Sequence, residues 1–203
     1  MVAHLDKNVG LLMEALGVWK METNTIVIFT SIGGPQQEGA MDPKFFGSSG
    51  GLRGEAGSVY EGGIRVPMCA VWPGLIAPGS RSERVGMTVD LFATVCEAAG
   101  AKAEGVDGVS LLADMKGKAP LSPQRDLVWV RREGGIMYAG REFYAFRRGD
   151  WKLVQNTAFQ QYELYNLAND PEEKHDLSKS EPKLYGELIA GLMLHVQRAG
   201  RTP

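Results

Sequence analysis

The sequence lacks a strong charge of either sign, a long apolar run and a basic leader. Its 22 lysines and arginines are balanced by 24 aspartates and glutamates, which leaves a formal net charge of −2. This balance creates no long-range field that would attract nucleic acid or anionic lipid, so we expect neither a nucleic-acid nor a membrane partner. No stretch approaches the ~18 apolar residues that a membrane span requires. The first residues, MVAHLDKNVGLLMEALG, do not form a signal peptide, and the compartment stays open.

Cysteine and histidine are scarce as well, with two cysteines and three histidines in the chain. Cys69 and Cys96 belong to no Cys-x-x-Cys pair and have no histidine at ligand spacing, which argues against structural zinc. Both lie in apolar runs, so we expect two buried free thiols. His4, His175 and His195 fall in three separate segments, and none is spaced for metal binding.

Two apolar runs in the first 120 residues have the composition of buried strands. They span residues 25–30 and 66–72, and a helix is predicted before them over residues 3–17, with Gly17 as its C-cap. A helix followed by a buried strand is half of a βαβ unit, which predicts a mainly parallel sheet. The glycine-rich residues 31–63 form a loop of a length that is usually functional or disordered.

A second helix is predicted after Asp90, its candidate N-cap, and it ends at Gly100. After Arg125 the apolar pattern changes to a period of two, and Gly149-Asp150 is a two-residue hairpin signal. Strands are predicted over residues 126–132, 143–148, 151–156 and 162–167, and an amphipathic helix over 181–198. The aromatic residues on the strands are expected to pack in a core rather than stack on sugars: Trp129, Trp151, Tyr162 and Tyr165.

Two glycine-rich motifs are candidates for a binding site. In Tyr60–Pro67, two glycines stand between Glu61 and Arg65, which predicts either close approach to a ligand or a turn held by that ion pair. In residues 50–58, Arg53 could bind an oxyanion through its planar fork or be a solvated loop arginine. The residue types alone indicate no nucleophile–base pair and no metal cluster.

Taken in order, several segments resemble the sulfatase family (arylsulfatase-like) of the alkaline phosphatase superfamily. They are HLDKNVGLLMEALG, NTIVIFTS, LRGEAGSVYEGGIRVPMCAVWPGLI, TVDLFATVCEAAG, RRGDWKLV and YELYNLANDPEEKHDL. The resemblance spans roughly residues 3–179 and corresponds to the C-terminal half of the family. It implies an α/β fold, with part of a mainly parallel α/β/α sheet over residues 1–120. A small antiparallel four-stranded sheet and a C-terminal helix would follow over residues 121–203.

The resemblance also implies chemistry. Family members cleave sulfate esters with a formylglycine made from the cysteine of Cys-x-Pro-Ser-Arg, and a calcium ion steadies the sulfate. The resemblance and the anion-binding fork of arginine together give Arg53 and Arg65 as candidate substrate-binding residues. The flanks of Cys69 and Cys96 do not match the nucleophile motif, so no catalytic residue is assigned.

Three departures affect the implied site. The family's Phe-Thr-Ser-Asp-Asn-Gly supplies calcium ligands, but this chain has Ile32 and Gly33 at the ligand positions, and neither side chain has an oxygen. The family's sulfate-binding lysine in Leu-Arg-Gly-Gly-Lys-Gly is replaced by Ala56, and Glu55 adds a negative charge. We therefore expect no calcium, no other cofactor and no sulfatase activity in the chain alone.

Three functional hypotheses stay open. The chain is a sulfatase fragment that becomes active only with a missing N-terminal half, a non-catalytic pseudo-sulfatase module, or a truncation product that self-associates. The module would bind sulfated glycan or a protein through four arginines: Arg53, Arg65, Arg131 and Arg132. Within the enzyme class, phosphate-ester chemistry is the runner-up to sulfate-ester chemistry.

Overall fold

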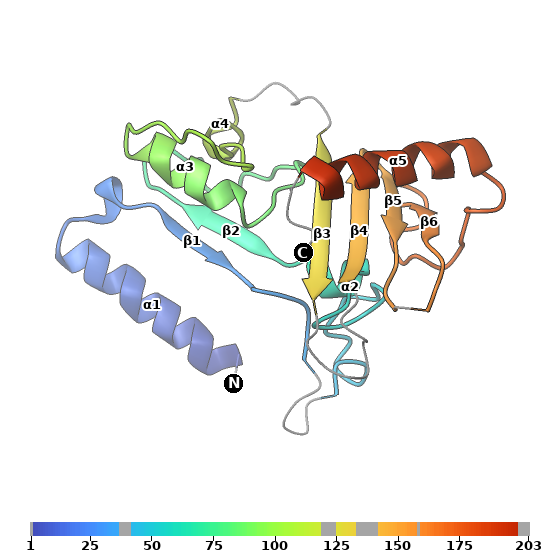
Figure 1. Cartoon of the computed structure of the whole chain (residues 1–203). Helices are drawn as coiled ribbons and strands as arrows, with labels where there is room; N and C mark the ends of the chain where they lie inside the picture. The colour runs from blue at the N-terminus through green and yellow to red at the C-terminus, as the bar shows by residue number, and fades with distance from the viewer. Residues whose placement is uncertain (1, 37–41, 119–124, 133–141, 158, 199–203) are drawn as a thin grey trace. The chain divides into compact units, whose positions relative to one another are not determined.

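The structure is a computed structural model of the chain, and it describes residues 2–36, 42–118, 125–132, 142–157 and 159–198 (Figure 1). The chain divides into two compact units. The first unit comprises residues 1–30 and 68–123, and the second comprises residues 31–67 and 124–203. The predicted boundary between residues 120 and 121 lies outside the described residues and stays a prediction. No helix within the described ranges combines the length and the apolar character needed to cross a membrane.

The first unit begins with α1 (Val2–Val18), which confirms the predicted N-terminal helix. Gly17 is not its C-cap, because the helix continues to Val18 and the left-handed residue that follows it is Lys20, with φ of 55°. The other elements of the unit are η1 (Glu22–Asn24), β1 (Val27–Thr30), β2 (Met68–Val71), α3 (Asp90–Ala98) and α4 (Leu112–Met115).

Strands β1 and β2 form a two-stranded antiparallel sheet in which Val27 is opposite Val71. The predicted parallel sheet is not seen among the described residues. The prediction that both strands are buried is wrong, since Phe29 is 40% exposed and Cys69 is exposed. Cys96 is half-buried, and both cysteines are free, so only the free state of the thiols is confirmed. An apolar run shows that a strand can be buried, but burial also needs segments that cover it.

Asp90 has a different role from the predicted N-cap. It is the first residue of α3 and is fully buried, and the N-cap position belongs to Val89. Its carboxylate accepts hydrogen bonds from the amides of Met87, at 2.7 Å, and Val109, at 2.9 Å, so it fastens two loops to the start of the helix. The predicted end of the helix is confirmed by Gly100, whose φ of 74° closes the last turn.

The second unit contains the predicted four-stranded antiparallel sheet and C-terminal helix. The strands are β3 (Asp126–Arg132), β4 (Glu142–Arg148), β5 (Trp151–Val154) and β6 (Glu163–Asn166), in that spatial order, and the helix is α5 (Pro182–Arg198). The Gly149-Asp150 hairpin is confirmed, because Arg148 pairs with Trp151 across it. Alternation of apolar and polar residues therefore placed all four strands correctly.

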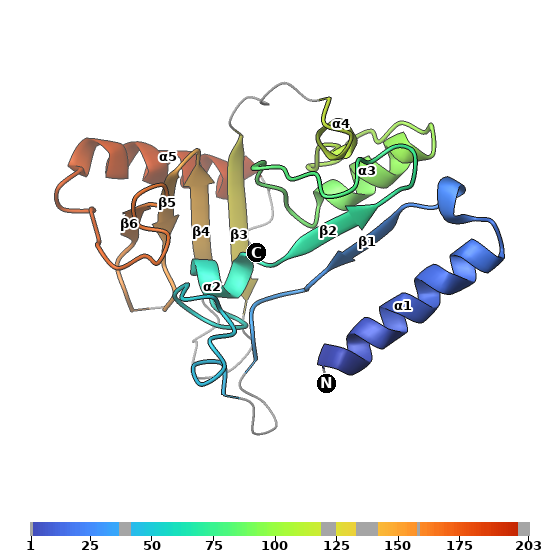
Figure 2. The same ribbon diagram turned by 180° about the vertical axis from the view of Figure 1, so that it is seen from behind.

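The two faces of this sheet are covered by different segments. On one face, α5 lies across the strands (Figure 1) and buries Leu188 and Leu192 against Phe146, Leu153 and Leu164. The opposite face is covered by the glycine-rich segment and by the short helix α2 (Glu61–Ile64), which Figure 2 shows in front of the sheet. There Val59 and Tyr60 pack on the buried residues Ala145, Val154, Tyr165 and Leu167.

The four strand aromatics pack in these two clusters, as predicted. Trp129 and Tyr165 belong to the cluster beneath the glycine-rich segment, and Trp151 and Tyr162 belong to the cluster beneath α5. The sheet is thus the platform on which the glycine-rich segment packs through Val59 and Tyr60.

Candidate functional site

An open depression of about 490 Å³ lies in the second unit, where the glycine-rich segment meets the sheet. Its walls carry three cationic side chains and one acidic one. The lining residues are Lys44, Arg53, Gly54, Glu55, Ala56, Ser58, Tyr60, Arg131 and Asn156. All of them belong to the second unit, so the depression is formed within a single compact body.

Glycines determine how the glycine-rich segment folds over the sheet. Gly54 and Gly57 have φ of 87° and 84°, in the left-handed region that favours glycine. A Cβ atom on Gly62 would lie 2.2 Å from the carbonyl oxygen of Gly54, and the Gly62 amide donates a 2.6 Å hydrogen bond to the carbonyl oxygen of Arg53. The Glu61-Gly62-Gly63 sequence is therefore required for close backbone approach, here to another part of the same chain.

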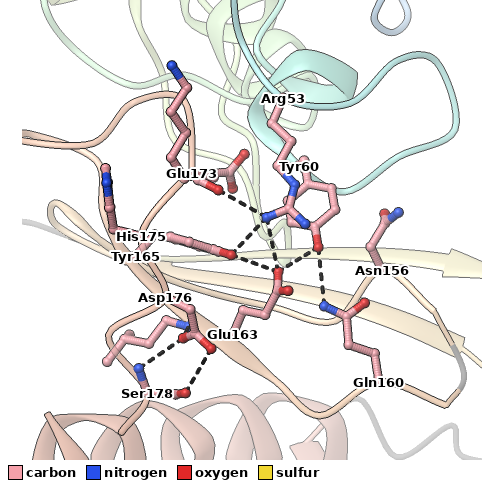
Figure 3. Close-up of polar contacts among 12 residues, drawn as sticks. Arg53, Tyr60, Asn156, Gln160, Glu163, Tyr165, Glu173, His175, Asp176 and Ser178 are labelled. Atoms are coloured by element: carbon pink, nitrogen blue, oxygen red, sulfur yellow. Dashed lines mark hydrogen bonds and ion pairs between the residues drawn. The ribbon is translucent and has the colours of Figure 1, made fainter. Parts of the chain in front are cut away.

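Arg53 borders the depression, but its guanidinium already forms hydrogen bonds with other residues of the chain (Figure 3). Its Nη1 donates to the hydroxyl of Tyr165, at 2.8 Å, and to the carbonyl oxygen of Glu173, at 3.0 Å. The guanidinium carbon lies 3.8 Å from the centre of the Tyr60 ring, a cation–π contact. Burial alone would lower the pKa of Arg53, but the oxygens of Tyr60, Glu163 and Tyr165 raise it, so the cation is stabilised. The side chain is still 40% exposed and borders the depression.

Arg65 lies elsewhere. It is exposed, it follows α2, and it is not among the residues that line the depression. Its backbone amide donates a 2.7 Å hydrogen bond to the carbonyl oxygen of Glu61, whereas the Glu61 carboxylate pairs with Lys152. The structure therefore brings together Arg53 and Arg131, but not Arg65. Arg132 is ion-paired with Glu142 on β4. A substrate-binding role for Arg53 and Arg65 stays a prediction.

A carboxylate network beside the depression escaped the sequence-based prediction (Figure 3). Glu163 Oε2 accepts hydrogen bonds from the hydroxyls of Tyr60, at 2.5 Å, and Tyr165, at 2.9 Å. The Gln160 amide donates to the Tyr60 hydroxyl at 3.3 Å. Burial and the hydrogen bond to Glu163 raise the pKa of Tyr60 to about 12. The tyrosines are therefore protonated donors at neutral pH.

Two further residues that line the depression also hold it together. Asn156 Oδ1 accepts hydrogen bonds from the Ser58 hydroxyl, at 3.1 Å, and from the Val59 amide, at 2.9 Å. Sequence alone gives little signal for this contact, because the partners are 97 and 98 residues apart.

The segments with the three departures lie next to each other. The Ala56 amide donates a 2.9 Å hydrogen bond to the carbonyl oxygen of Pro35, two residues beyond Gly33. Ile32 is fully exposed, and the hydroxyl of Ser31 donates to the carbonyl oxygen of Gly33 at 2.7 Å. In the part of the chain that the structure describes, no group of three or more His, Cys, Asp or Glu residues could hold a metal ion. The side chains at Ile32 and Gly33 do not fit a calcium ion, which needs oxygen ligands.

Comparison with known proteins gives consistent matches over nearly the whole chain. Residues 1–101 match the family model described as Sulfatase, and residues 56–199 match that of N-sulphoglucosamine sulphohydrolase, C-terminal. Arylsulfatase A of Homo sapiens is 34% identical over 196 residues, covering 85% of this chain and 37% of that protein. N-acetylgalactosamine-6-sulfatase of Sus scrofa is 37% identical over 224 residues, covering 97% of this chain and 42% of that protein.

Solved structures agree with these matches. The crystal structure of Ps i-CgsB in complex with k-i-k-neocarrahexaose is 31% identical with a TM-score of 0.78, over 95% of this chain and 41% of that one. The phosphonate monoester hydrolase of Agrobacterium radiobacter, 23% identical with a TM-score of 0.71, shares the fold. The chain spans about two fifths of the length of these relatives.

Proposed function

Because this chain belongs to the sulfatase family, we propose that it supplies the C-terminal framework of a sulfuric ester hydrolase and does not cleave sulfate esters by itself. One observation carries the proposal. The positions that correspond to the family's calcium ligands and sulfate-binding lysine hold Ile32, Gly33 and Ala56, and the Ala56 amide bonds to Pro35, two residues beyond Gly33. The framework is retained while the side chains that would contact metal and sulfate are changed.

The expected loss of catalysis is large. Calcium takes about six to eight oxygen ligands, and two of the positions that should supply them have no side-chain oxygen. Removing a single group that stabilises the charge of the transition state typically costs ~10²–10³ in rate. The chain also contains no Cys-x-Pro-Ser-Arg sequence from which a formylglycine could be made.

We place a sulfated sugar at the depression as the ligand class of the framework. The similarity to N-acetylgalactosamine-6-sulfatase and to Ps i-CgsB, whose structure holds k-i-k-neocarrahexaose, supports a sugar ligand. The cationic side chains of Lys44, Arg53 and Arg131 on the walls suit its sulfate group.

The test is an assay with 4-nitrophenyl sulfate and calcium, using the chain alone and with an added polypeptide that carries the Cys-x-Pro-Ser-Arg half of a relative. We expect no turnover by the chain alone. With the added half, we expect activity to rise in the combined variant Ile32→Asp, Gly33→Asn and Ala56→Lys. A control variant makes the same chemical changes in a loop of the first unit: Ile76→Asp, Gly79→Asn and Ala77→Lys. Turnover by the unmodified chain alone, clearly above the blank, refutes the proposal.

A second candidate function is a non-catalytic pseudo-sulfatase module that binds sulfated glycan. The three cations on the walls of the depression, against the single acidic Glu55, favour it. Calorimetry should give heat with a sulfated hexasaccharide and none with its desulfated counterpart. Arg131→Gln should weaken that binding, whereas Arg132→Gln, which changes an arginine that does not line the depression, should not. Absence of heat with the sulfated sugar counts against this candidate.

A further inference from the structure

A fully buried group of three charges lies beneath α2. Lys152 Nζ is 2.9 Å from Glu61 Oε1 and 2.8 Å from Glu173 Oε1. The side chains of Lys152 and Glu173 are completely buried, and that of Glu61 is 3% exposed. We call these three residues the buried triad. None of them lines the depression, and the proposed chemistry does not use them.

The buried triad joins three segments that are distant in the sequence. Glu61 is the first residue of α2, Lys152 is on β5, and Glu173 is in the loop after β6. A second bond ties two of these segments directly, because the Glu61 amide donates to Glu173 Oε2 at 2.7 Å. The loop adopts an unusual conformation at this point, since Glu173 has a φ of 55°.

The contacts of α2 continue from the triad to the depression. The residue after Glu61, Gly62, donates its amide to the carbonyl oxygen of Arg53 at 2.6 Å. The carbonyl oxygen of Glu173 in turn accepts from the Arg53 guanidinium at 3.0 Å. Glu173 therefore contacts Arg53 directly, and Glu61 is linked to Arg53 through its neighbour Gly62; the Arg53 side chain borders the depression.

Stability alone does not account for this arrangement. Burying charges costs several kcal/mol per ion, and well-packed apolar residues can often replace a buried ion group with no loss of stability. One ammonium group also leaves two carboxylates only half-neutralised, and burial raises the pKa of Glu173 above its ordinary value. Charged groups differ from apolar ones because their hydrogen bonds are directional. They can therefore fix the relative orientation of the segments that they join.

We propose that the buried triad is a positioning device, in which Lys152 holds Glu61 and Glu173 so that α2 and Arg53 keep the depression in its ligand-binding form. Lys152, Glu61 and Glu173 are positioning residues and do not touch the ligand. The expected effect on a sulfated ligand rests on the proposed function, whereas the effect on the order of residues 53–64 does not.

The experiment compares three variants of the full chain with the unmodified protein. Lys152→Met removes the bridging cation. The neutral variant combines Lys152→Met with Glu61→Gln and Glu173→Gln, which removes all three charges of the buried triad at nearly constant volume. Lys174→Met is the matched control, because Lys174 forms an ion pair with Glu172 on the surface. Three quantities are measured: the thermal midpoint, amide hydrogen exchange by peptide, and the affinity for a sulfated hexasaccharide.

We expect Lys152→Met to lower amide protection in residues 53–64 by at least about tenfold while the peptides of α5 keep theirs. The neutral variant should recover most of the thermal midpoint but not the protection of residues 53–64. The affinity for the hexasaccharide should fall about tenfold in both variants. Lys174→Met should match the unmodified protein in all three measurements.

Two results overturn the proposal. One is an equal loss of protection throughout the second unit, which would make the triad a general stabiliser. The other is a neutral variant with normal protection in residues 53–64, which would show that the bridging cation is not needed. If Lys152→Met does not fold, Glu61→Gln is judged by the same two criteria. If the unmodified chain does not bind the hexasaccharide, the proposed function fails, and the exchange data still decide the role of the triad.

Discussion

The hydroxyl of Tyr60 donates a 2.5 Å hydrogen bond to Oε2 of Glu163, and this bond joins the glycine-rich segment to the edge strand β6. Tyr60 itself is buried, and its ring also supports the guanidinium of Arg53. Hydrogen bonds to charged groups contribute about 1.5–3 kcal/mol, and the partial exposure of the Glu163 side chain favours the lower end.

We therefore expect Tyr60→Phe to lower the free energy of unfolding by about 1.5 kcal/mol, as measured by urea denaturation. The ring remains, so the change reports the hydroxyl and not the packing. Tyr185→Phe on α5 is the matched control, since its hydroxyl is not part of the Glu163 network, and it should change stability by much less. Equal effects of the two substitutions would contradict this role for Tyr60.

Tyr60 should also make the stability of the chain depend on pH in the alkaline range. Burial and the hydrogen bond to Glu163 raise the pKa of Tyr60 from 10.0 to about 12 in the folded chain. A group with a raised folded pKa contributes stability that is complete below its unfolded pKa and is lost as the pH rises through its folded pKa. Between pH 10 and 12 the unmodified chain should lose stability more steeply than Tyr60→Phe, in urea titrations at fixed pH. Parallel curves for the two proteins would contradict the assignment.

Two glycines in the middle of α5 provide a matched pair for the packing of the helix on the sheet. A Cβ atom on Gly191 would lie 2.8 Å from Cζ of Phe146, whereas a Cβ atom on Gly186 would meet nothing within 4 Å. Gly191→Ala should thus destabilise the chain by about 1–3 kcal/mol through overpacking. Gly186→Ala should stabilise it by about 0.5–1 kcal/mol, since alanine favours a helix over glycine. Thermal melts of the two variants should move in opposite directions, and a shift in the same direction would contradict this packing.

The sheet and the C-terminal helix of the second unit were predictable because each of their elements has a local signal, whereas α2 lies in a segment predicted as a loop and turn. Alternating apolar residues predicted β3 to β6, glycine followed by aspartate predicted the hairpin, and helical spacing predicted α5. The exposure of β1 and β2 was not predictable, because the same apolar run is buried or exposed according to what covers it. The local pattern also does not reveal whether two such strands pair in parallel or antiparallel fashion.

The candidate site was predictable only in part. Arg53 was identified from its motif and lies at the depression, whereas Arg65 belongs to the same stretch and lies away from it. Lys152 was missed, since a lysine between Trp151 and Leu153 on a strand is expected at the solvent-exposed face. Its burial depends on Glu61, which is 91 residues away, so no local pattern reports it.

Asp176 should make the stability of the chain depend on pH in the acid range, with a sign opposite to that of Tyr60. Burial alone would raise its pKa, but hydrogen bonds from the amides of Leu164 and Ser178 lower it below 3.8. A carboxyl group with a lowered folded pKa contributes stability that is present above its unfolded pKa and is lost as the pH falls through its folded pKa. The stability difference between the unmodified chain and Asp176→Asn should therefore be larger at pH 7 than at pH 3.

Urea denaturation at the two pH values measures this difference, which we expect to be about 1 kcal/mol at pH 7. Asp150→Asn is the control, because Asp150 is exposed at the tip of the hairpin and asparagine suits that turn. A difference for Asp176→Asn that grows toward pH 3 would contradict the inferred role of its charge.

Glu55 is the one acidic side chain on the walls of the depression, beside Ala56. A carboxylate near a bound sulfate repels it, and partly exposed charge interactions are worth about 0.2–1 kcal/mol. Glu55→Gln should therefore tighten the binding of a sulfated hexasaccharide by roughly threefold in calorimetry at low ionic strength. The gain should shrink as salt is added, because screening shortens the range of the interaction to about 10 Å at 0.1 M. Glu187→Gln, an exposed change of the same kind on α5, should leave the affinity unaltered, and an equal gain there would mean that only the net charge of the chain matters.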